Sequence, residues 1–220
     1  TQSRSSAASD VYKRQVYESP QFLYMLIAMC IFAHYPKNKR LSYIKRFYNA
    51  ISTFKISLPT PIMAGVRTPS RQFSSCVLIE CGDSLDSINA TTSAIVKYVS
   101  QRAGIGINAG RIRALGSEIR AGEAQHTGCI PFFKLFQAAV KSCSQGGVRG
   151  GAATLYFPLW HLEIESLLVL KNNRGVEENR VRHLDYTVQI NKLLYQRLIK
   201  NQLITLFSPH DVPDLYEAFF

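Results

Sequence analysis

From residue 75 onward, two hydrophobic patterns alternate along the chain. Short apolar runs of strand length predict five β-strands. The predicted strands are Cys76–Glu80, Ile105–Asn108, Ala153–Phe157, Tyr186–Ile190 and Ile204–Phe207. Between them, apolar residues recur three or four positions apart, as on one face of an amphipathic helix. The predicted helices are Ser87–Gln101, Thr127–Ser142, His161–Leu170 and Lys192–Lys200. Repeated strand–helix units indicate a parallel sheet with right-handed crossovers.

The first part of the chain follows a helical pattern only. Residues 20–55 predict two helices. In the second, Leu41, Ile44 and Ile51 share one face, and lysines and arginines occupy the other. The next segment, residues 57–69, contains three prolines and a glycine, so we expect irregular structure there.

Residues 1–15 are polar and serine-rich and lack any periodicity. We interpret them as a disordered or non-native leader outside the fold. Three regions are therefore expected: this leader, a helical region over residues 16–57, and an α/β domain over residues 58–220.

The composition is that of a globular protein, because 46% of the residues are hydrophobic and the mean hydropathy is −0.03. The longest apolar run, Phe22–Ala33, is shorter than the roughly 18 residues of a membrane helix. The five cysteines are irregularly spaced without a CxxC pair. This spacing indicates neither a zinc ribbon nor a disulfide framework and favours reduced thiols in a cytoplasmic protein. The five histidines show no HxH or HExxH spacing, so no metal site is expected.

A formal net charge of +11 indicates an anionic partner. The basic residues are spread along the chain with one local cluster, Lys37–Arg46, and no RNA-recognition or helix-turn-helix signature accompanies them. The charge therefore favours small phosphate-bearing ligands over nucleic acid. A nucleic-acid-binding protein would instead show a steep salt dependence of binding.

Two glycine-containing segments suggest ligand contact. Gly104–Ala109 matches the G-x-G-x-x-A fingerprint, but a helix precedes it and the glycines lie in the strand, so a dinucleotide fold is not indicated. Glycine within a strand indicates close approach by a ligand or another chain segment. Ser144–Gly151 holds four glycines in eight residues. It is either a plain flexible connection or a loop that changes conformation.

Arginines and one cysteine are the candidate chemical groups. Arg111, Arg113 and Arg120 flank flexible backbone and could clamp a polyphosphate; the alternative is a solvated basic loop. Cys76 begins a predicted strand just after an arginine-containing loop. It is either a redox or nucleophilic thiol or a small buried apolar residue.

Four motifs in order carry a close resemblance to a known family. They are SLPTPIMAGVRTPSRQFSSCVLIECGD at 57–83, QRAGIGINAGRIRALGS at 101–117, KSCSQGGVRGGAATL at 141–155 and ITLFSPHDVPDLYEAFF at 204–220. With them, the chain resembles the large, catalytic subunit of class I ribonucleoside-diphosphate reductase from about Tyr17 to Phe220. The resemblance implies the first half, about five parallel strands, of a ten-stranded α/β barrel. The chain would then be an internal fragment without the radical-carrying cysteine of the family.

The resemblance also implies a role for individual residues. Cys76 matches one of two redox-active thiols that close to a disulfide during turnover. The substrate-binding positions are Thr60, Ser75, Ala103, Gly104, Gln145 and Arg149. Gln145 and Arg149 belong to the loop that relays effector identity to the substrate base. The positions that bind a deoxynucleoside triphosphate effector are Asp83, Ser84, Leu85, Arg113 and Arg120.

The function implied by the resemblance is reduction of ribonucleoside diphosphates to deoxyribonucleoside diphosphates by thiyl-radical chemistry. The expected partners are a radical-generating small subunit, thioredoxin or glutaredoxin as reductant, a dNTP or ATP effector with Mg²⁺, and a second copy of the chain at the helices 87–101 and 127–142. No metal, nucleic acid or membrane is expected at this chain. Two alternatives remain: a stand-alone nucleotide-binding and dimerisation module without catalysis, and a basic nucleic-acid-binding protein.

Overall fold

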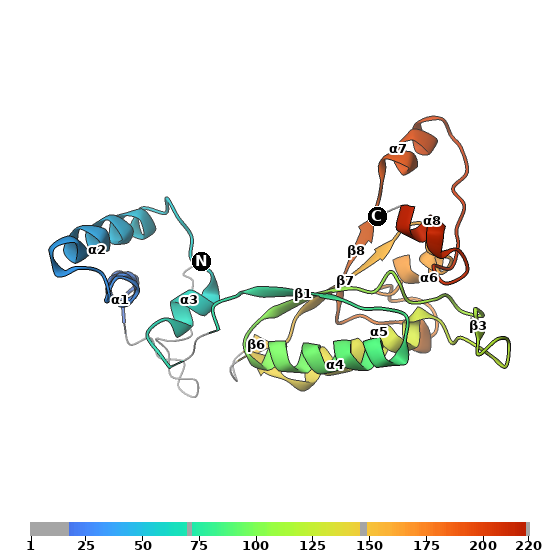
Figure 1. Cartoon of the computed structure of the whole chain (residues 1–220), viewed down its shortest axis with the longest axis horizontal. Coiled ribbons are helices and arrows are strands. Elements are labelled where there is room, and N and C mark those ends of the chain that lie inside the picture. Colours follow the sequence, from blue (N-terminus) through green and yellow to red (C-terminus); the bar gives the residue numbers. More distant parts are fainter. Residues whose placement is uncertain (1–17, 70–71, 146–148, 219–220) are drawn as a thin grey trace. The chain divides into compact units, whose positions relative to one another are not determined.

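The structure, a computed structural model, describes residues 18–69, 72–145 and 149–218 (Figure 1). The predicted leader, residues 1–15, lies outside these ranges. The chain divides into two compact units. The first comprises Thr1–Ser75, Gln101–Ala103 and Gln145–Arg149, and the second comprises Cys76–Ser100, Gly104–Ser144 and Gly150–Phe220.

The first unit contains the two predicted helices, α1 (Pro20–Ile31) and α2 (Lys37–Ser52), which pack against each other. Their buried side chains are Leu23, Ile27 and Ala28 of α1 and Ile44 and Ile51 of α2. Phe32 adds an aromatic contact at the turn, since its ring stacks on Tyr43 with centroids 5.6 Å apart. The prediction of two helices here is confirmed.

The proline-containing segment of the first unit is more regular than its composition predicts. Irregular structure was expected over residues 57–69, but α3 (Thr60–Gly65) forms within it. Pro61 occupies the first turn, where a helix requires no N–H donor from that residue and the fixed φ of proline already suits the helix. Arg67 then pairs with Glu18 at 2.5 Å, which ties the end of this segment to the start of α1.

The second unit is built on a parallel sheet with the strand order β1-β2-β7-β8. The strands are β1 (Cys76–Glu80), β2 (Gly104–Asn108), β7 (Ala153–Pro158) and β8 (Asp185–Gln189). The parallel α/β architecture and four of the five predicted strands are confirmed.

Two amphipathic helices, α4 (Leu85–Ser100) and α5 (Cys129–Ser142), lie side by side on one face of the sheet (Figure 1). Their apolar residues and the inward-facing strand residues form the core. Its fully buried side chains include Ile88, Ile95, Phe133, Phe136, Ile107, Leu155 and Phe157. The rings of Phe133 and Phe157 stack with centroids 6.3 Å apart, which joins α5 to β7.

The other face of β1 carries exposed residues. Cys76 is exposed and Leu78 is 79% exposed, and both lie in register beside glycines of β2. A Cβ atom at Gly106 would lie 2.5 Å from Leu78 Cδ2 and 3.1 Å from Tyr156 Cε2. Gly106 therefore leaves room for the side chains of Leu78 and Tyr156. A glycine within a strand predicts close approach by a ligand or by another chain segment, and the second is observed here.

The prediction of a fifth strand over Ile204–Phe207 is wrong for the described structure. Phe207 makes a single parallel bridge with His161, its N–H donates to Trp160 O, and its carbonyl accepts from Leu162 N. These partners belong to the turn after β7, so the ladder cannot extend beyond one residue. Among the described residues, this sheet has four parallel strands and does not close into a barrel.

The remaining elements are short. α6 (Ile164–Leu168) and α7 (Lys192–Ile199) fall within predicted helices, and the Asn191 side chain caps α7 by accepting from Leu194 N. Elements that the sequence did not predict are β3 (Glu118–Ile119), β4 (Ala124–Gln125), β5 (Ser144–Gln145), β6 (Arg149–Gly150), the 3₁₀ helix η2 (Glu177–Asn179) and α8 (Pro213–Ala218). Within the described ranges, each helix is too short or too polar to cross a bilayer.

Adjacent glycines before β7 provide a test of the packing. A Cβ atom at Gly151 would lie 2.1 Å from the Val140 carbonyl oxygen and 2.9 Å from Val99 Cγ1, whereas one at Gly150 would meet nothing within 4 Å. Gly151→Ala should therefore lower the free energy of unfolding by about 2 kcal/mol or more, and Gly150→Ala should change it by less than about 0.5 kcal/mol. Urea unfolding followed by the fluorescence of Trp160, the one tryptophan in the sequence, measures both. Equal stability of the two variants would contradict the packing of α4, α5 and β7.

Candidate nucleotide site and redox cysteine

The central feature of the candidate site is a pair formed by Asp83 and Arg113. Asp83 follows β1 and Arg113 follows β2, so both lie beyond the carboxyl ends of neighbouring parallel strands. The Asp83 carboxylate accepts from the Arg113 backbone N–H and from its Nε, each at 2.7 Å, and Arg113 Nη2 lies 2.5 Å from the same carboxylate. Two predicted effector residues, 30 positions apart in sequence, are thus brought into direct contact.

Arg113 is fixed in place but keeps donors for a ligand. Its Nη1 donates to Glu118 O at 2.6 Å, in addition to the two contacts of its guanidinium with Asp83. A guanidinium carries five N–H groups, so the contacts described use three of them. The side chains of Arg113 and Asp83 are 18% and 22% exposed. The pair is therefore partly desolvated, and two guanidinium N–H groups are not used by these contacts.

Three side chains from distant segments hold the backbone around Arg113. His161 Nε2 lies 2.9 Å from Ile112 O, Glu163 accepts from Leu115 N at 3.0 Å, and Ser208 Oγ accepts from Ala114 N at 3.1 Å. Sequence reasoning missed all three. A polar side chain expected to be buried, such as Ser208 within the 204–220 motif, was the one available signal, because buried polar groups need partners.

Cys129, His161 and Glu163 place potential metal-ligand atoms within 4.8 Å of one another. The carboxylate of Glu163 and both ring nitrogens of His161 already have hydrogen-bond partners within the protein. Glu163 Oε2 accepts from both Leu115 N and Cys129 N, and His161 Nδ1 accepts from Glu163 N while its Nε2 contacts Ile112 O. Burial raises the pKa of the Cys129 thiol well above its ordinary value and lowers the pKa of His161, so both groups are neutral at pH 7. The cluster joins the turn after β7 to the start of α5.

Ser84 and Leu85, the other predicted effector residues of this turn, follow Asp83 directly. Ser84 Oγ accepts from Ser87 N at 3.2 Å and so caps the start of α4. Leu85 is 67% exposed. A large apolar side chain beside a charged pair is available to pack against a ligand.

Arg120 lies apart from this pair. It sits between β3 and β4 with φ 51°, and its side chain is exposed. Figure 1 shows this hairpin projecting from the end of the sheet. Among the contacts of the described residues, none joins Arg120 to Asp83 or Arg113, so the structure brings only one of the two predicted arginines to the acidic group.

Cys76 is the first residue of β1, and Gly104, a predicted substrate-binding residue, is its register partner on β2. The Cys76 thiol is exposed, which excludes the buried, purely apolar interpretation. By contrast, Cys81 is fully buried, and burial raises the pKa of its thiol. Of Cys76 in β1 and Cys81 immediately after it, only Cys76 is accessible.

The other predicted substrate-binding residues belong to the first compact unit. Thr60 begins α3 and is exposed, Ser75 is exposed, and Ala103 is fully buried, so that only its backbone could meet a ligand. Gln145 ends β5 and Arg149 begins β6; residues 146–148 between them lie outside the described residues.

Two family descriptions match the chain. The ribonucleotide reductase barrel domain matches residues 74–220, and the ribonucleotide reductase all-alpha domain matches residues 8–71. The barrel match alone covers more than half of the chain. The chain belongs to the ribonucleotide reductase family. The resemblance found in the four sequence motifs is confirmed.

Ribonucleotide reductase subunits from several organisms are close relatives. The chain is 80% identical to ribonucleoside-diphosphate reductase 1 subunit alpha of Escherichia coli, 81% identical to the subunit alpha of Haemophilus influenzae, and 64% identical to that of Enterobacteria phage T4. Each comparison covers 94% of this chain and 27% of the relative. The chain thus spans about a quarter of the length of these reductase subunits.

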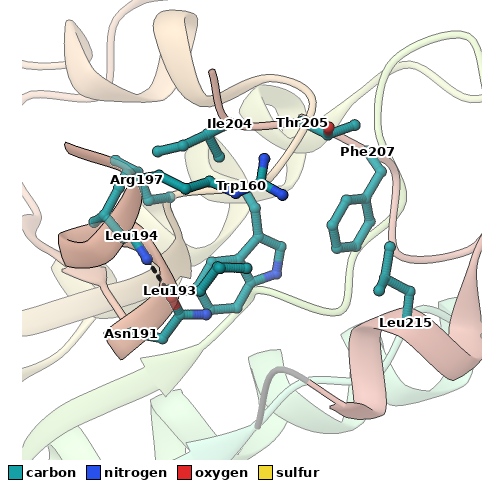
Figure 2. Close-up of a pocket in the computed structure, with 10 residues that line it drawn as sticks. Trp160, Asn191, Leu193, Leu194, Arg197, Ile204, Thr205, Phe207 and Leu215 are labelled. Carbon is teal, nitrogen blue, oxygen red and sulfur yellow. Dashed lines mark hydrogen bonds between the residues drawn. The ribbon is translucent and has the colours of Figure 1, made fainter. Parts of the chain in front are cut away.

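The second compact unit also contains an apolar cavity of about 250 Å³ (Figure 2). Trp160 lies at its centre, with residues of α7 on one side and Phe207 and Leu215 on the other. Its lining contains none of the predicted site residues. The cavity is therefore separate from the Asp83–Arg113 pair and from Cys76.

Cysteine reactivity tests the exposure of individual thiols in the described residues. In the folded chain, iodoacetamide should modify Cys76 and Cys30, which are exposed, while Cys81 and Cys129 react only after unfolding. Because burial raises the pKa of the last two thiols, their reactive thiolates form only at higher pH. Peptide mass spectrometry of alkylated protein between pH 7 and about 8.5, the ordinary thiol pKa, measures the order. Modification of Cys129 before Cys76 would contradict the structure.

Proposed function

We propose that these residues form part of the large subunit of a ribonucleoside-diphosphate reductase, which reduces ribonucleoside diphosphates to deoxyribonucleoside diphosphates. The observation that carries the proposal is the 80% identity across 94% of the chain to a protein of that name. The accessible Cys76 beside Gly104 supports it, because the proposed chemistry needs a thiol that substrate and reductant can reach.

Cys76 would supply one of two thiols that are oxidised in each turnover. Two thiols give up two electrons and two protons as one disulfide forms, and the ribose C2′ hydroxyl leaves as water. The second redox thiol and the thiyl-radical cysteine would come from outside these 220 residues. A small subunit would generate the radical, and thioredoxin or glutaredoxin would reduce the disulfide again.

Asp83 and Arg113 would form the core of a deoxynucleoside triphosphate effector site that also takes ATP. The carboxylate of Asp83 suits a ribose hydroxyl, and the remaining Arg113 donors suit phosphate oxygens with Mg²⁺ bound. Leu85 would pack on the nucleotide, and Arg120 would reach the phosphates from the β3–β4 hairpin. The loop from Gln145 to Arg149 would relay effector identity to the substrate site.

A second copy of the chain would dock on α4 and α5. These helices bury one face against the sheet, yet Tyr98 and Leu135 remain 38% and 40% exposed. Apolar residues on the outward faces of both helices are what a dimer interface would cover. A dNTP-dependent shift to dimer in gel filtration would support this part of the proposal.

The test of the reductase proposal is the oxidation state of Cys76 during a single turnover. The full-length subunit carrying this sequence is reduced, freed of reductant, and mixed with the small subunit and a ribonucleoside diphosphate. We expect deoxyribonucleoside diphosphate in proportion to a new disulfide at Cys76, detected by differential alkylation and mass spectrometry. Product formation with Cys76 still reduced would refute its redox role.

A stand-alone nucleotide-binding module is the second candidate function. The observation that favours it is that the Asp83–Arg113 pair is complete within one compact unit. Such a module would bind a deoxynucleoside triphosphate but form no disulfide at Cys76 when a ribonucleoside diphosphate is added. The single-turnover experiment therefore separates the two functions.

A further inference from the structure

Residues 208–211, part of the 204–220 motif, lie close to the Asp83–Arg113 pair. Neither the strand predicted over residues 204–207 nor the proposed effector site accounts for this position. Ser208 is 1% exposed; its Oγ accepts from Ala114 N and lies 2.8 Å from Ser117 Oγ. Asp211 N donates to Ser208 O, which closes a turn. The segment is thus fixed against the loop that carries Arg113, through a buried serine pair.

This turn places His210 beside the effector pair. His210 Nδ1 lies 3.7 Å from Asp83 Oδ2, and its side chain is 42% exposed. Arg113 already occupies Asp83 through its backbone N–H and guanidinium. A ligand group that approaches Asp83 from solvent therefore meets the imidazole of His210.

We infer that His210 is a further nucleotide-binding residue of this site, whose imidazolium donates to the hydroxyl or phosphate oxygens of a nucleoside triphosphate held by Asp83 and Arg113. The inference rests on the proposed effector function. An imidazolium adds a second cation to a site whose acidic group is already neutralised by Arg113, so the added charge acts on the ligand. Protonation of a histidine beside a polyphosphate is favoured as the pH falls through about 6.5.

The charged and titratable groups near the pair come from several segments. Asp83 follows β1, Arg113 follows β2, His126 precedes α5, and Asp211 is next to His210 in the turn. His126 interacts electrostatically with both Asp83 and Arg113, but burial lowers its pKa, and its Nδ1 accepts from Gly128 N. Burial therefore disfavours the imidazolium of His126, whereas the His210 side chain is 42% exposed.

The test compares the pH dependence of nucleotide binding in matched variants. Equilibrium binding of a deoxynucleoside triphosphate with Mg²⁺ is measured from pH 5.5 to 8.5 for the full-length subunit, for His210→Gln, and for His183→Gln, an exposed histidine before β8. The ratio of the dissociation constants of a variant and the parent cancels the titration of the nucleotide itself. For His210→Gln we expect about fivefold weaker binding at pH 6 and less than about twofold at pH 8, the size of one partly exposed charge contact.

Each outcome decides a different point. The control His183→Gln should match the parent at every pH, and both variants should keep the melting temperature of the parent, because both imidazoles are exposed. A pH-independent ratio close to one for His210→Gln would overturn the inference and leave the effector site standing. Failure of the parent to bind the nucleotide at any pH would overturn the effector site and the inference together.

Discussion

Replacing Cys76 by serine in the full-length subunit should end repeated turnover while nucleotide binding stays unchanged. A hydroxyl cannot form the disulfide that returns electrons from the reductant, so the steady-state rate should fall by about a hundredfold or more, at least about 2.7 kcal/mol in activation free energy. Because the side chain is exposed, the substitution should cost little folding stability. Steady-state formation of deoxyribonucleoside diphosphate with thioredoxin as reductant measures the effect.

The matched control for this variant is Cys30→Ser, since Cys30 is also exposed but lies in α1 of the other compact unit. It should retain the turnover of the parent. Sustained turnover by Cys76→Ser, under conditions where the parent depends on thioredoxin, would refute the redox role of the strand β1 cysteine.

Replacing Arg113 by alanine should weaken binding of a deoxynucleoside triphosphate by about 1.5–3 kcal/mol, which is roughly a ten- to hundredfold rise in the dissociation constant. The substitution removes charge-assisted donors to phosphate, and it also takes the guanidinium contacts away from Asp83, which is only 22% exposed. It should therefore lower the free energy of unfolding by about 1–2 kcal/mol as well. Isothermal titration calorimetry and urea unfolding measure the two effects.

Arg111 serves as the control for Arg113, and Arg120 is a second predicted phosphate contact that tests the same site. Arg111 pairs with Glu80 and Glu217 and is 40% exposed, so Arg111→Ala should change stability by less than about 1 kcal/mol and leave nucleotide affinity near that of the parent. Arg120→Ala should weaken binding without loss of stability, because its side chain is exposed at the hairpin. Unchanged affinity in both Arg113→Ala and Arg120→Ala would return the loop to the interpretation of a solvated basic surface.

Regular hydrophobic patterns predicted most of the fold. β1 was predicted with its observed bounds, and the helices α4 and α5 within two residues at each end, because these segments pack one apolar face on the sheet. The prediction of a strand over residues 204–207 failed because the backbone of Phe207 bonds to a turn rather than to a neighbouring strand. Alternating side-chain burial in a strand-like segment does not reveal whether a partner strand exists.

The candidate site, like the fold, was predicted where the sequence signal is local and was missed where a residue's role depends on tertiary contacts. Asp83, Arg113 and Cys76 were predictable as site residues from residue type and motif resemblance. Glu163, His161 and Ser208 were not, since their role depends on β7 lying next to β2 in the sheet although about 45 residues separate the two strands. That neighbour relation brings the turn after β7 against the Arg113 loop, and no local pattern encodes it.

The most direct test of the account is reduction of ribonucleoside diphosphates by the full-length subunit together with its small subunit and thioredoxin, with and without one deoxynucleoside triphosphate. We expect deoxyribonucleoside diphosphates to form, and the effector to change the relative rates among substrates at a concentration roughly ten- to hundredfold lower in the parent than in Arg113→Ala. Binding of the effector without any reduction of substrate would contradict the account and favour a nucleotide-binding module without catalysis.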